Sequence, residues 1–207
     1  GSDSEFSAPD FGWVWRDGLF EPVAIAGQPV SAAQADWTFA SGPSLLTMGA
    51  DGTVAYRASV RPTARPQDPA STAFLVKKAG VSVLVAKIGD QVPGMRSGVT
   101  IARFTAAQAL DDGRLAIGLG MIGPGIVTST STGNDSLSAV WGPGERGSWG
   151  PDGFIQITRK GDLAPGPCGY VYGYPGNTEP TVTSLALGDV SAARIDTYRV
   201  GQFQSSR

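Results

Sequence analysis

Short apolar runs with alternating polar positions dominate the chain, and glycine-containing turns separate them. The run from Val81 to Ile88 is rich in β-branched residues and too short for a stable helix, which favours a strand. Together with Phe74 to Lys78 it predicts a hairpin around Ala79-Gly80, because glycine reaches positive φ at little steric cost. The pattern therefore indicates β structure built from short antiparallel strands.

Similar hairpins are predicted before and after this one. Their strands and turns are Trp13 to Arg16 with Phe20 to Ala26 around Asp17-Gly18, and Val140-Trp141 with Phe154 to Arg159 around Asp152-Gly153. Thr53 to Val60 and Thr100 to Phe104 predict further strands. Helix signals are weak: Thr105 to Leu110 predicts a short helix, and Ser31 to Ala35 predicts a single helical turn.

A glycine-led phrase occurs three times. It reads Gly27-Gln28-Pro29, then Gly89-Asp90-Gln91-Val92-Pro93-Gly94, then Gly161-Asp162-Leu163-Ala164-Pro165-Gly166, with spacings of 89−27 = 62 and 161−89 = 72 residues. A second phrase keeps step with it at Gly52, Gly113 and Gly188. Such periods are typical of tandem units about the size of a four-stranded propeller blade or slightly larger.

The repeats predict the organisation of the chain. Residues 1–6 read as cloning-derived sequence, 7–71 as the first repeat, 72–135 as the second, 136–200 as the third and 201–207 as a tail. We expect an all-β fold of tandem antiparallel four-stranded repeats, propeller-like, with three blades per chain. Propellers use about four to eight blades. Two copies closing a six-bladed ring, a fragment of a longer array, and another β arrangement all remain open.

Composition narrows the classes of function. A net charge of −2 gives no reason to expect nucleic acid as a partner. No stretch approaches the ~20 apolar residues that a membrane-spanning helix needs. Cys168 is the only cysteine, which excludes an internal disulfide and leaves the compartment open.

Histidine is absent, which removes the commonest general base and the commonest metal ligand. Without histidine to activate it, Cys168 is interpreted as an inert thiol. Asp90 and Asp162, which follow turn glycines, are interpreted as turn-fixing carboxylates, with a shared calcium site as the alternative. We expect no catalytic residue, no metal site and no cofactor.

Carboxylates carry the one enzymatic alternative, a polysaccharide-acting hydrolase that uses a carboxylate pair. Asp111, Asp112, Asp135 and Glu145 are its candidates. Asp111 and Asp112 are adjacent, so on an extended strand their side chains would point to opposite faces. A turn is the favoured interpretation of this pair.

Aromatic residues are the remaining candidates for binding. Trp149, Tyr170, Tyr172 and Tyr174 are predicted ligand-binding residues, because flat rings stack on sugars and the tyrosines alternate along the chain. Trp13 and Trp141 are interpreted instead as equivalent core positions of their repeats.

The repeated phrases also carry a resemblance. Val85-Ala86-Lys87-Ile88-Gly89-Asp90 and its counterparts, each followed by a phrase such as Gly52-Thr53-Val54-Ala55-Tyr56, resemble the tandem repeats of uncharacterised secreted bacterial proteins of the choice-of-anchor type. The resemblance covers about residues 10 to 192. It implies a secreted or cell-surface β-repeat protein without an established activity. The first repeat departs from the pattern with Gln28 in place of the aspartate.

The sequence thus predicts a non-catalytic extracellular binding or surface-structural module, which recognises carbohydrate or protein through loops between blades. We expect no nucleic acid and no membrane insertion. A homodimer that closes a six-bladed ring is one of the three assemblies that the sequence leaves open.

Overall fold

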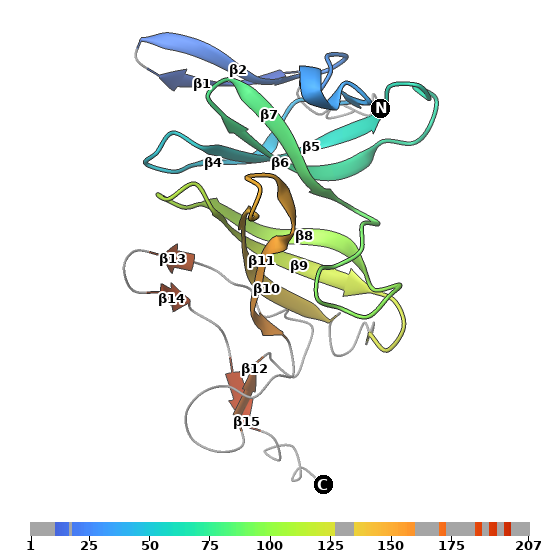
Figure 1. Ribbon diagram of the computed structural model, residues 1–207, viewed down its shortest axis with the longest axis vertical. Helices are drawn as coiled ribbons and strands as arrows, with labels where there is room; N and C mark the ends of the chain where they lie inside the picture. Colours follow the sequence, from blue (N-terminus) through green and yellow to red (C-terminus); the bar gives the residue numbers. More distant parts are fainter. Residues whose placement is uncertain are drawn as a thin grey trace, which may run out of the picture. The chain divides into compact units, whose positions relative to one another are not determined.

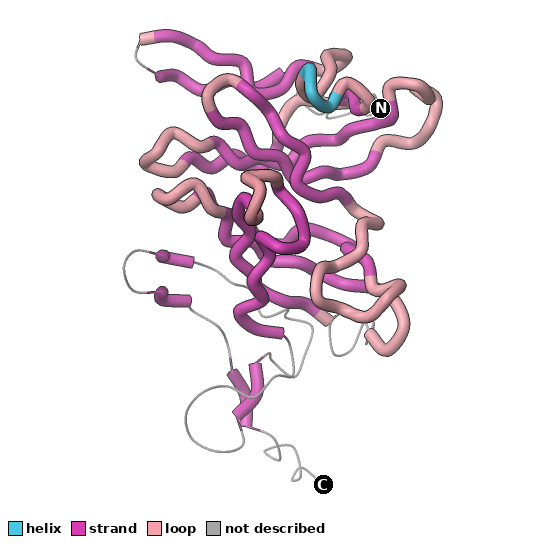
Figure 2. The backbone as a smooth tube through the Cα atoms, viewed as in Figure 1, coloured by secondary structure: helices cyan, strands magenta, loops and turns pink. Residues whose placement is uncertain are grey.

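The computed structural model describes residues 11–16, 18–126 and 135–159, and the backbone of four short strands after them. The described residues form strands and turns, with a single 3-10 turn at Ala32–Gln34 (Figure 2). The strands are β1 (Phe11–Arg16), β2 (Leu19–Ile25), β3 (Trp37–Phe39), β4 (Ser44–Met48), β5 (Val54–Pro62), β6 (Ser71–Lys78), β7 (Val81–Lys87), β8 (Thr100–Ala109), β9 (Leu115–Ile122), β10 (Ser136–Pro143), β11 (Trp149–Arg159), β12 (Tyr170–Tyr172), β13 (Leu185–Leu187), β14 (Ser191–Ala193) and β15 (Thr197–Arg199). The predicted all-β class is confirmed.

The chain divides into two compact units, Gly1–Ile88 and Gly89–Arg207. The first unit contains the hairpin β1–β2 and a sheet in the order β3–β5–β6–β7, with β4 also paired to β5 (Figure 1). The second contains the sheet β11–β10–β9–β8 and the two-stranded pairs β12–β15 and β13–β14. All these pairings are antiparallel.

Three hairpins share one irregularity, and we call them the bulged hairpins: β1–β2, β6–β7 and β10–β11. In each, the register shifts by one residue after the second pair from the open end, at Gly12/Trp13, Phe74/Leu75 and Ser138/Ala139. The extra residue on the second strand is Val23, Val85 or Ile157. A bulge recurring at one place marks these hairpins as equivalent elements of a structural repeat.

The turn that follows the first two bulged hairpins is also repeated. Gly27 donates its amide to the Phe39 carbonyl at 2.8 Å, and Gly89 donates to the Ile101 carbonyl at 2.8 Å. Both glycines have positive φ, 84° and 92°, a region that side chains disfavour. Donors and acceptors alike lie 62 residues apart (89−27 and 101−39). Gly161 lies outside the described residues.

Each large sheet combines strands from two consecutive repeats. We use the name leading pair for the strands that come first in such a sheet. In the second unit these are β8 and β9, and in the first unit β3 and β4 together take the place of β8, since both pair with β5. The leading pair is followed by a bulged hairpin, because β5 pairs with β6 and β9 pairs with β10. The sequence predicted that the four strands of a sheet come from one repeat. In the structure they come from two consecutive repeats.

Strands β12 to β15 follow the nested pairing order of a leading pair, in two separate two-stranded sheets. β12 pairs with β15, and β13 pairs with β14 between them in sequence. In the first unit the corresponding pairings are both made to one strand, with β3 on the later residues of β5 and β4 on the earlier ones. In the described part of the chain, β1–β2 is a bulged hairpin without a leading pair, and β12–β15 is a leading pair without a bulged hairpin.

The core of the first unit lies between hairpin β1–β2 and the sheet. Val14 and Val23 pack in one buried cluster with Tyr56 and Leu75, whose side chains are fully buried. Lys77 adds a polar link, since its Nζ lies 3.2 Å from Glu21 Oε1 and donates a hydrogen bond to the Pro22 carbonyl. One face of β1–β2 is therefore covered by the sheet that follows it in sequence.

Most local predictions hold, and two are wrong. The turns at Ala79-Gly80 and at Gly18, and the helical turn after Ser31, are present. The helix predicted at Thr105 to Leu110 is absent, because β8 continues to Ala109 and pairs with β9. The turn predicted at Asp152-Gly153 lies inside β11 instead.

Candidate functional site

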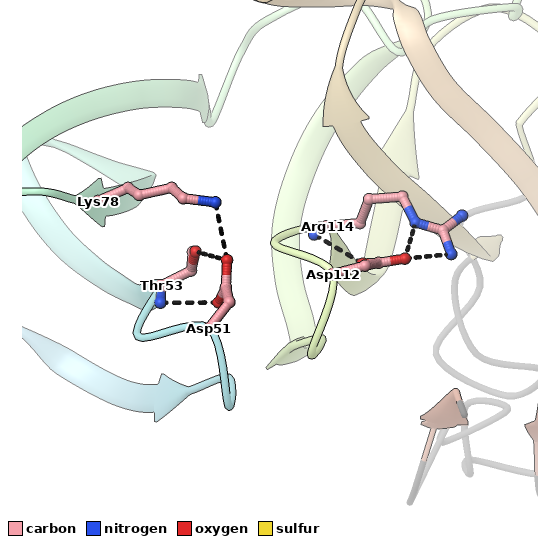
Figure 3. Close-up of polar contacts among 5 residues, drawn as sticks. All are labelled: Asp51, Thr53, Lys78, Asp112 and Arg114. Atoms are coloured by element: carbon pink, nitrogen blue, oxygen red, sulfur yellow. Dashed lines mark hydrogen bonds and ion pairs between the residues drawn. The ribbon is translucent and has the colours of Figure 1, made fainter. Parts of the chain in front are cut away.

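Asp112 is one of the carboxylates that the hydrolase alternative named, and the structure places it and Asp51 in turns at the tips of the leading pairs. Asp51 accepts hydrogen bonds from the Thr53 amide at 2.9 Å and the Thr53 hydroxyl at 2.7 Å. Lys78 Nζ lies 2.8 Å from the same carboxylate (Figure 3). Since Thr53 is fully buried, Asp51 supplies a partner to an amide that has left water.

Asp112 repeats this role one repeat later. It accepts a hydrogen bond from the Arg114 amide at 3.0 Å and from Arg114 Nε at 2.6 Å (Figure 3). The turns agree in backbone as well, because Gly52 donates to the Gly49 carbonyl at 3.0 Å and Gly113 to the Leu110 carbonyl at 3.1 Å. The repeated aspartate thus fixes a turn in both repeats.

These contacts hold both carboxylates ionised. Partial burial would raise the pKa of Asp51, but the hydrogen bonds from Lys78 and Thr53 together outweigh it and lower the pKa below its ordinary value. The hydrogen bond from the Arg114 side chain likewise lowers the pKa of Asp112. A general acid needs a raised pKa, so both residues lack the character of a catalytic acid.

Asp51→Ala is expected to lower the free energy of unfolding by about 1–3 kcal/mol at neutral pH, because the buried Thr53 amide loses its partner. The folded-state pKa is depressed, so this contribution is present above the ordinary value of 3.8 and is lost as the pH falls below it. Urea unfolding of both proteins at pH 7 and pH 2.5 measures it. Asp36→Ala, which changes an exposed aspartate, should stay within about 0.5 kcal/mol of the parent protein. A penalty for Asp51→Ala that is the same at both pH values would contradict this role.

The other candidates for a carboxylate pair have separate surroundings. Asp111 is exposed beside Asp112 in the turn. Asp135 is buried, and its Oδ2 lies 2.7 Å from Arg159 Nη2. Glu145 is exposed beyond the end of β10. Among the described residues, no group of three or more acidic, histidine or cysteine side chains is placed to hold a metal ion.

The predicted aromatic binding residues are only partly within the described chain. Trp149 is half-buried at the start of β11, opposite Pro143. Tyr170 and Tyr172 lie in β12, whose side chains are not described, and Tyr174 lies outside the described residues. Their joint role in binding stays a prediction. Cys168 and Asp162 also lie outside the described residues.

Trp141 is a core residue, as predicted, whereas Trp13 is not. Trp141 is 4% exposed, packs edge-on against Phe154 and donates Nε1–H to the Gly150 carbonyl at 3.0 Å. Register makes Trp15 its equivalent, since Trp15 lies opposite Phe20 as Trp141 lies opposite Phe154. Trp13 is 48% exposed, so the predicted equivalence of Trp13 and Trp141 is wrong.

The structure shows an exposed apolar surface that the sequence did not predict, and we call it the aromatic face. It consists of three opposed pairs on β1 and β2: Phe11 with Ile25, Trp13 with Pro22, and Trp15 with Phe20. Trp15 and Phe20 are 62% and 64% exposed. The rings of Trp13 and Phe20 meet edge-on with centroids 3.9 Å apart.

A groove of about 390 Å³ runs over the aromatic face, lined by Phe11, Gly12, Trp13, Phe20, Pro22 and Ile25. The groove is apolar, without an ionisable group in its lining. Contiguous exposed apolar surface of this kind marks a binding or assembly site. The opposite face of the same hairpin, with Val14 and Val23, is the one that packs on the sheet.

The first strand of each of the other two bulged hairpins is buried on the corresponding face. Trp13 corresponds by register to Leu75 in β6 and to Ala139 in β10, and both are fully buried. Trp15 and Phe20 stand where the second hairpin has Lys77 and Ser82. The third hairpin has Trp141 and Phe154 at the same positions, with Trp141 4% exposed, so the ring pair alone does not distinguish the first hairpin.

No family model, no curated protein and no solved structure matches this chain. No helix in the described part of the chain has both the length and the apolar character needed to cross a bilayer. The described residues thus define an all-β protein of antiparallel sheets, with structural acidic turns and an exposed aromatic face on β1 and β2.

Proposed function

We propose that this chain is a non-catalytic extracellular module of β-repeat type, which serves binding or surface structure. The observation that carries the proposal is the shared role of Asp51 and Asp112, which occupy the same turn and accept the same backbone hydrogen bond two residues on. Carboxylates used twice as turn residues are parts of a scaffold. The hydrolase alternative gains no comparable support from the described residues.

A propeller-like arrangement is part of this proposal. Two four-position antiparallel sheets, each made of a leading pair and a bulged hairpin, support it. Propeller blades are sheets of this size, repeated about four to eight times around an axis. A chain with three such units reaches this range when two copies combine. The secreted or cell-surface location rests on the resemblance of the repeated phrases.

The ligand in this proposal is a carbohydrate or a protein, bound by loops between sheets. Trp149 supports it, because its ring is half-buried beside the hairpin loop at residues 144–148. The bond from Trp141 to the Gly150 carbonyl holds the neighbouring backbone in place. A positioned but accessible ring is suited to stacking on a sugar. The sequence adds Tyr170, Tyr172 and Tyr174 to the proposed ligand-binding residues.

A glycan array tests the ligand class. We expect the parent protein to bind a polysaccharide without releasing reducing ends, and Trp149→Ala to weaken binding about tenfold, the effect of losing about 1.4 kcal/mol. Trp149→Phe keeps a flat ring and should retain most of the affinity. Release of product that depends on Asp112 would overturn the proposal in favour of a hydrolase. Equal binding by Trp149→Ala and the parent would remove Trp149 from the site.

A further inference from the structure

We propose that a second copy of this chain completes hairpin β1–β2, by adding its leading pair β12–β15 to the edge of β1 and by covering the aromatic face with its strand β11. The inference rests on the propeller-like arrangement proposed above and identifies the surfaces that would join two copies. Each copy offers both surfaces to the other, so the assembly closes as a dimer with six sheets.

The edge of β1 is the first argument. In the other two bulged hairpins the corresponding edge carries a leading pair, with Tyr56 of β5 opposite Leu75 and Ile117 of β9 opposite Ala139. Trp13 holds this position in β1, and no strand in the described part of the chain pairs with it there. An unpaired edge strand exposes amides and carbonyls that readily accept a further strand.

The strands β12 to β15 supply the complementary half. They share the nested pairing order of a leading pair, in two separate two-stranded sheets, and within the described chain they pair only with one another. In the two complete sheets, a leading pair is joined along its second strand to a bulged hairpin. Hairpin β1–β2 therefore lacks a leading pair, and strands β12 to β15 lack a bulged hairpin. Each of them has the part that is missing from the other.

The aromatic face is the second, independent argument. Phe20 is 64% exposed, whereas the residue at the same register position, Ser82 in β7, is 5% exposed. Leu75, the counterpart of Trp13, is buried in the cluster that also contains Val23 of the preceding hairpin. Within the first unit, then, this face of one sheet packs against the bulge residue of the hairpin before it.

This contact within the first unit points to the surface that fits the aromatic face. Ile157 is the bulge residue of hairpin β10–β11, equivalent to Val23 and Val85, and it is 40% exposed where they are 3% and 9% exposed. Its neighbour Ile155 is 60% exposed. Inside the first unit, the bulge residue Val23 and Leu75 lie in one buried cluster. Their counterparts, Ile157 and Trp13, are both exposed. Both are apolar, so their burial favours association.

Sedimentation equilibrium of the parent protein tests the assembly. We expect a mass of 2 × 21.3 = 42.6 kDa at micromolar concentration. Phe20→Ser and Ile155→Ser, each at an exposed position, should raise the dimer dissociation constant about tenfold or more and leave the circular dichroism spectrum unchanged. Met48→Ser, at a 53% exposed position in β4, is the matched control and should remain dimeric. A parent protein that is monomeric at tens of micromolar would overturn the proposal.

A mixed disulfide experiment identifies the occupant. Two proteins carry Cys168→Ser together with either Phe20→Cys or Ile155→Cys, and oxidation of their mixture should give a covalent dimer in higher yield than either protein alone. A third protein carries both Phe20→Cys and Ile155→Cys in one chain. If a disulfide forms only within this chain and never between chains, the same copy closes the contact and the proposal is overturned. Dimerisation is read separately from glycan binding. A dimer that binds no glycan contradicts the ligand class alone, and a monomer that binds one contradicts this inference alone.

Discussion

Leu75→Ala is expected to lower the free energy of unfolding by about 2–5 kcal/mol, the range for removing a fully buried leucine side chain. Leu75 is 0% exposed in β6, lies opposite both Tyr56 and Leu84, and packs in the cluster that joins hairpin β1–β2 to the sheet. The truncation leaves a cavity between these two elements. Urea unfolding followed by circular dichroism measures the loss.

The matched control for this change is Leu19→Ala. Leu19 is 72% exposed and lies next to the turn of hairpin β1–β2, opposite Arg16 and off the aromatic face. Its truncation removes little buried area, so the free energy of unfolding should change by no more than about 0.5 kcal/mol. Similar losses for the two leucines would show that Leu75 does not lie in the core that the structure describes.

The hairpins were predictable because their turn chemistry is local. Ala79 and Gly80 have φ of 48° and 80°, and two successive positive φ values are what a two-residue type I′ turn requires. Gly18 and Gly27, at 80° and 84°, follow the same steric logic. A glycine between alternating apolar runs carries this information within a few residues.

The sharing of strands between repeats was not predictable in this way. The strands β5 and β6 pair from Val54 opposite Lys77 to Val60 opposite Ser71. Sequence periodicity identifies a repeat without showing where along it one sheet ends and the next begins. That choice depends on which edges meet in three dimensions.

The segment Thr105 to Leu110 shows how tertiary structure overrides local propensity. Its alanines and glutamine favour a helix, and the sequence predicted one. The segment extends β8 instead, where Ala107 lies opposite Ile117 and Ala109 opposite Leu115. Strand pairing and burial outweigh a helix preference of a few tenths of a kcal/mol per residue.

The turn at Asp111-Asp112 was predicted more fully than the aromatic face. An aspartate followed by glycine indicates its own turn, and Asp51 and Asp112 accept the backbone hydrogen bonds that this pattern implies. Exposure of Trp13 depends on what covers the hairpin. Alternation shows that Trp13 and Trp15 share a face, and it does not show which face is buried.

Gly153→Ala is expected to lower the free energy of unfolding by about 1–3 kcal/mol through a backbone clash. A Cβ on Gly153 would lie 1.9 Å from the Gly142 carbonyl oxygen and 3.2 Å from the Gly144 nitrogen, both on the backbone across the hairpin. Backbone atoms cannot rotate away as a side chain does. The hairpin β10–β11 must therefore open near Trp149 to admit the methyl group.

Gly150→Ala provides the control within the same strand. The nearest atom to a Cβ there is Asp152 Oδ1 at 3.1 Å, which belongs to a side chain that can move, so the change should stay within about 0.5 kcal/mol of the parent. Urea unfolding measures both proteins. Tryptophan fluorescence, with Trp141 and Trp149 beside the altered segment, reports local rearrangement, and we expect a shifted emission for Gly153→Ala alone. Equal stability of the two variants would show that β10 and β11 do not approach each other at Gly153. It would favour the turn that the sequence predicted at Asp152-Gly153.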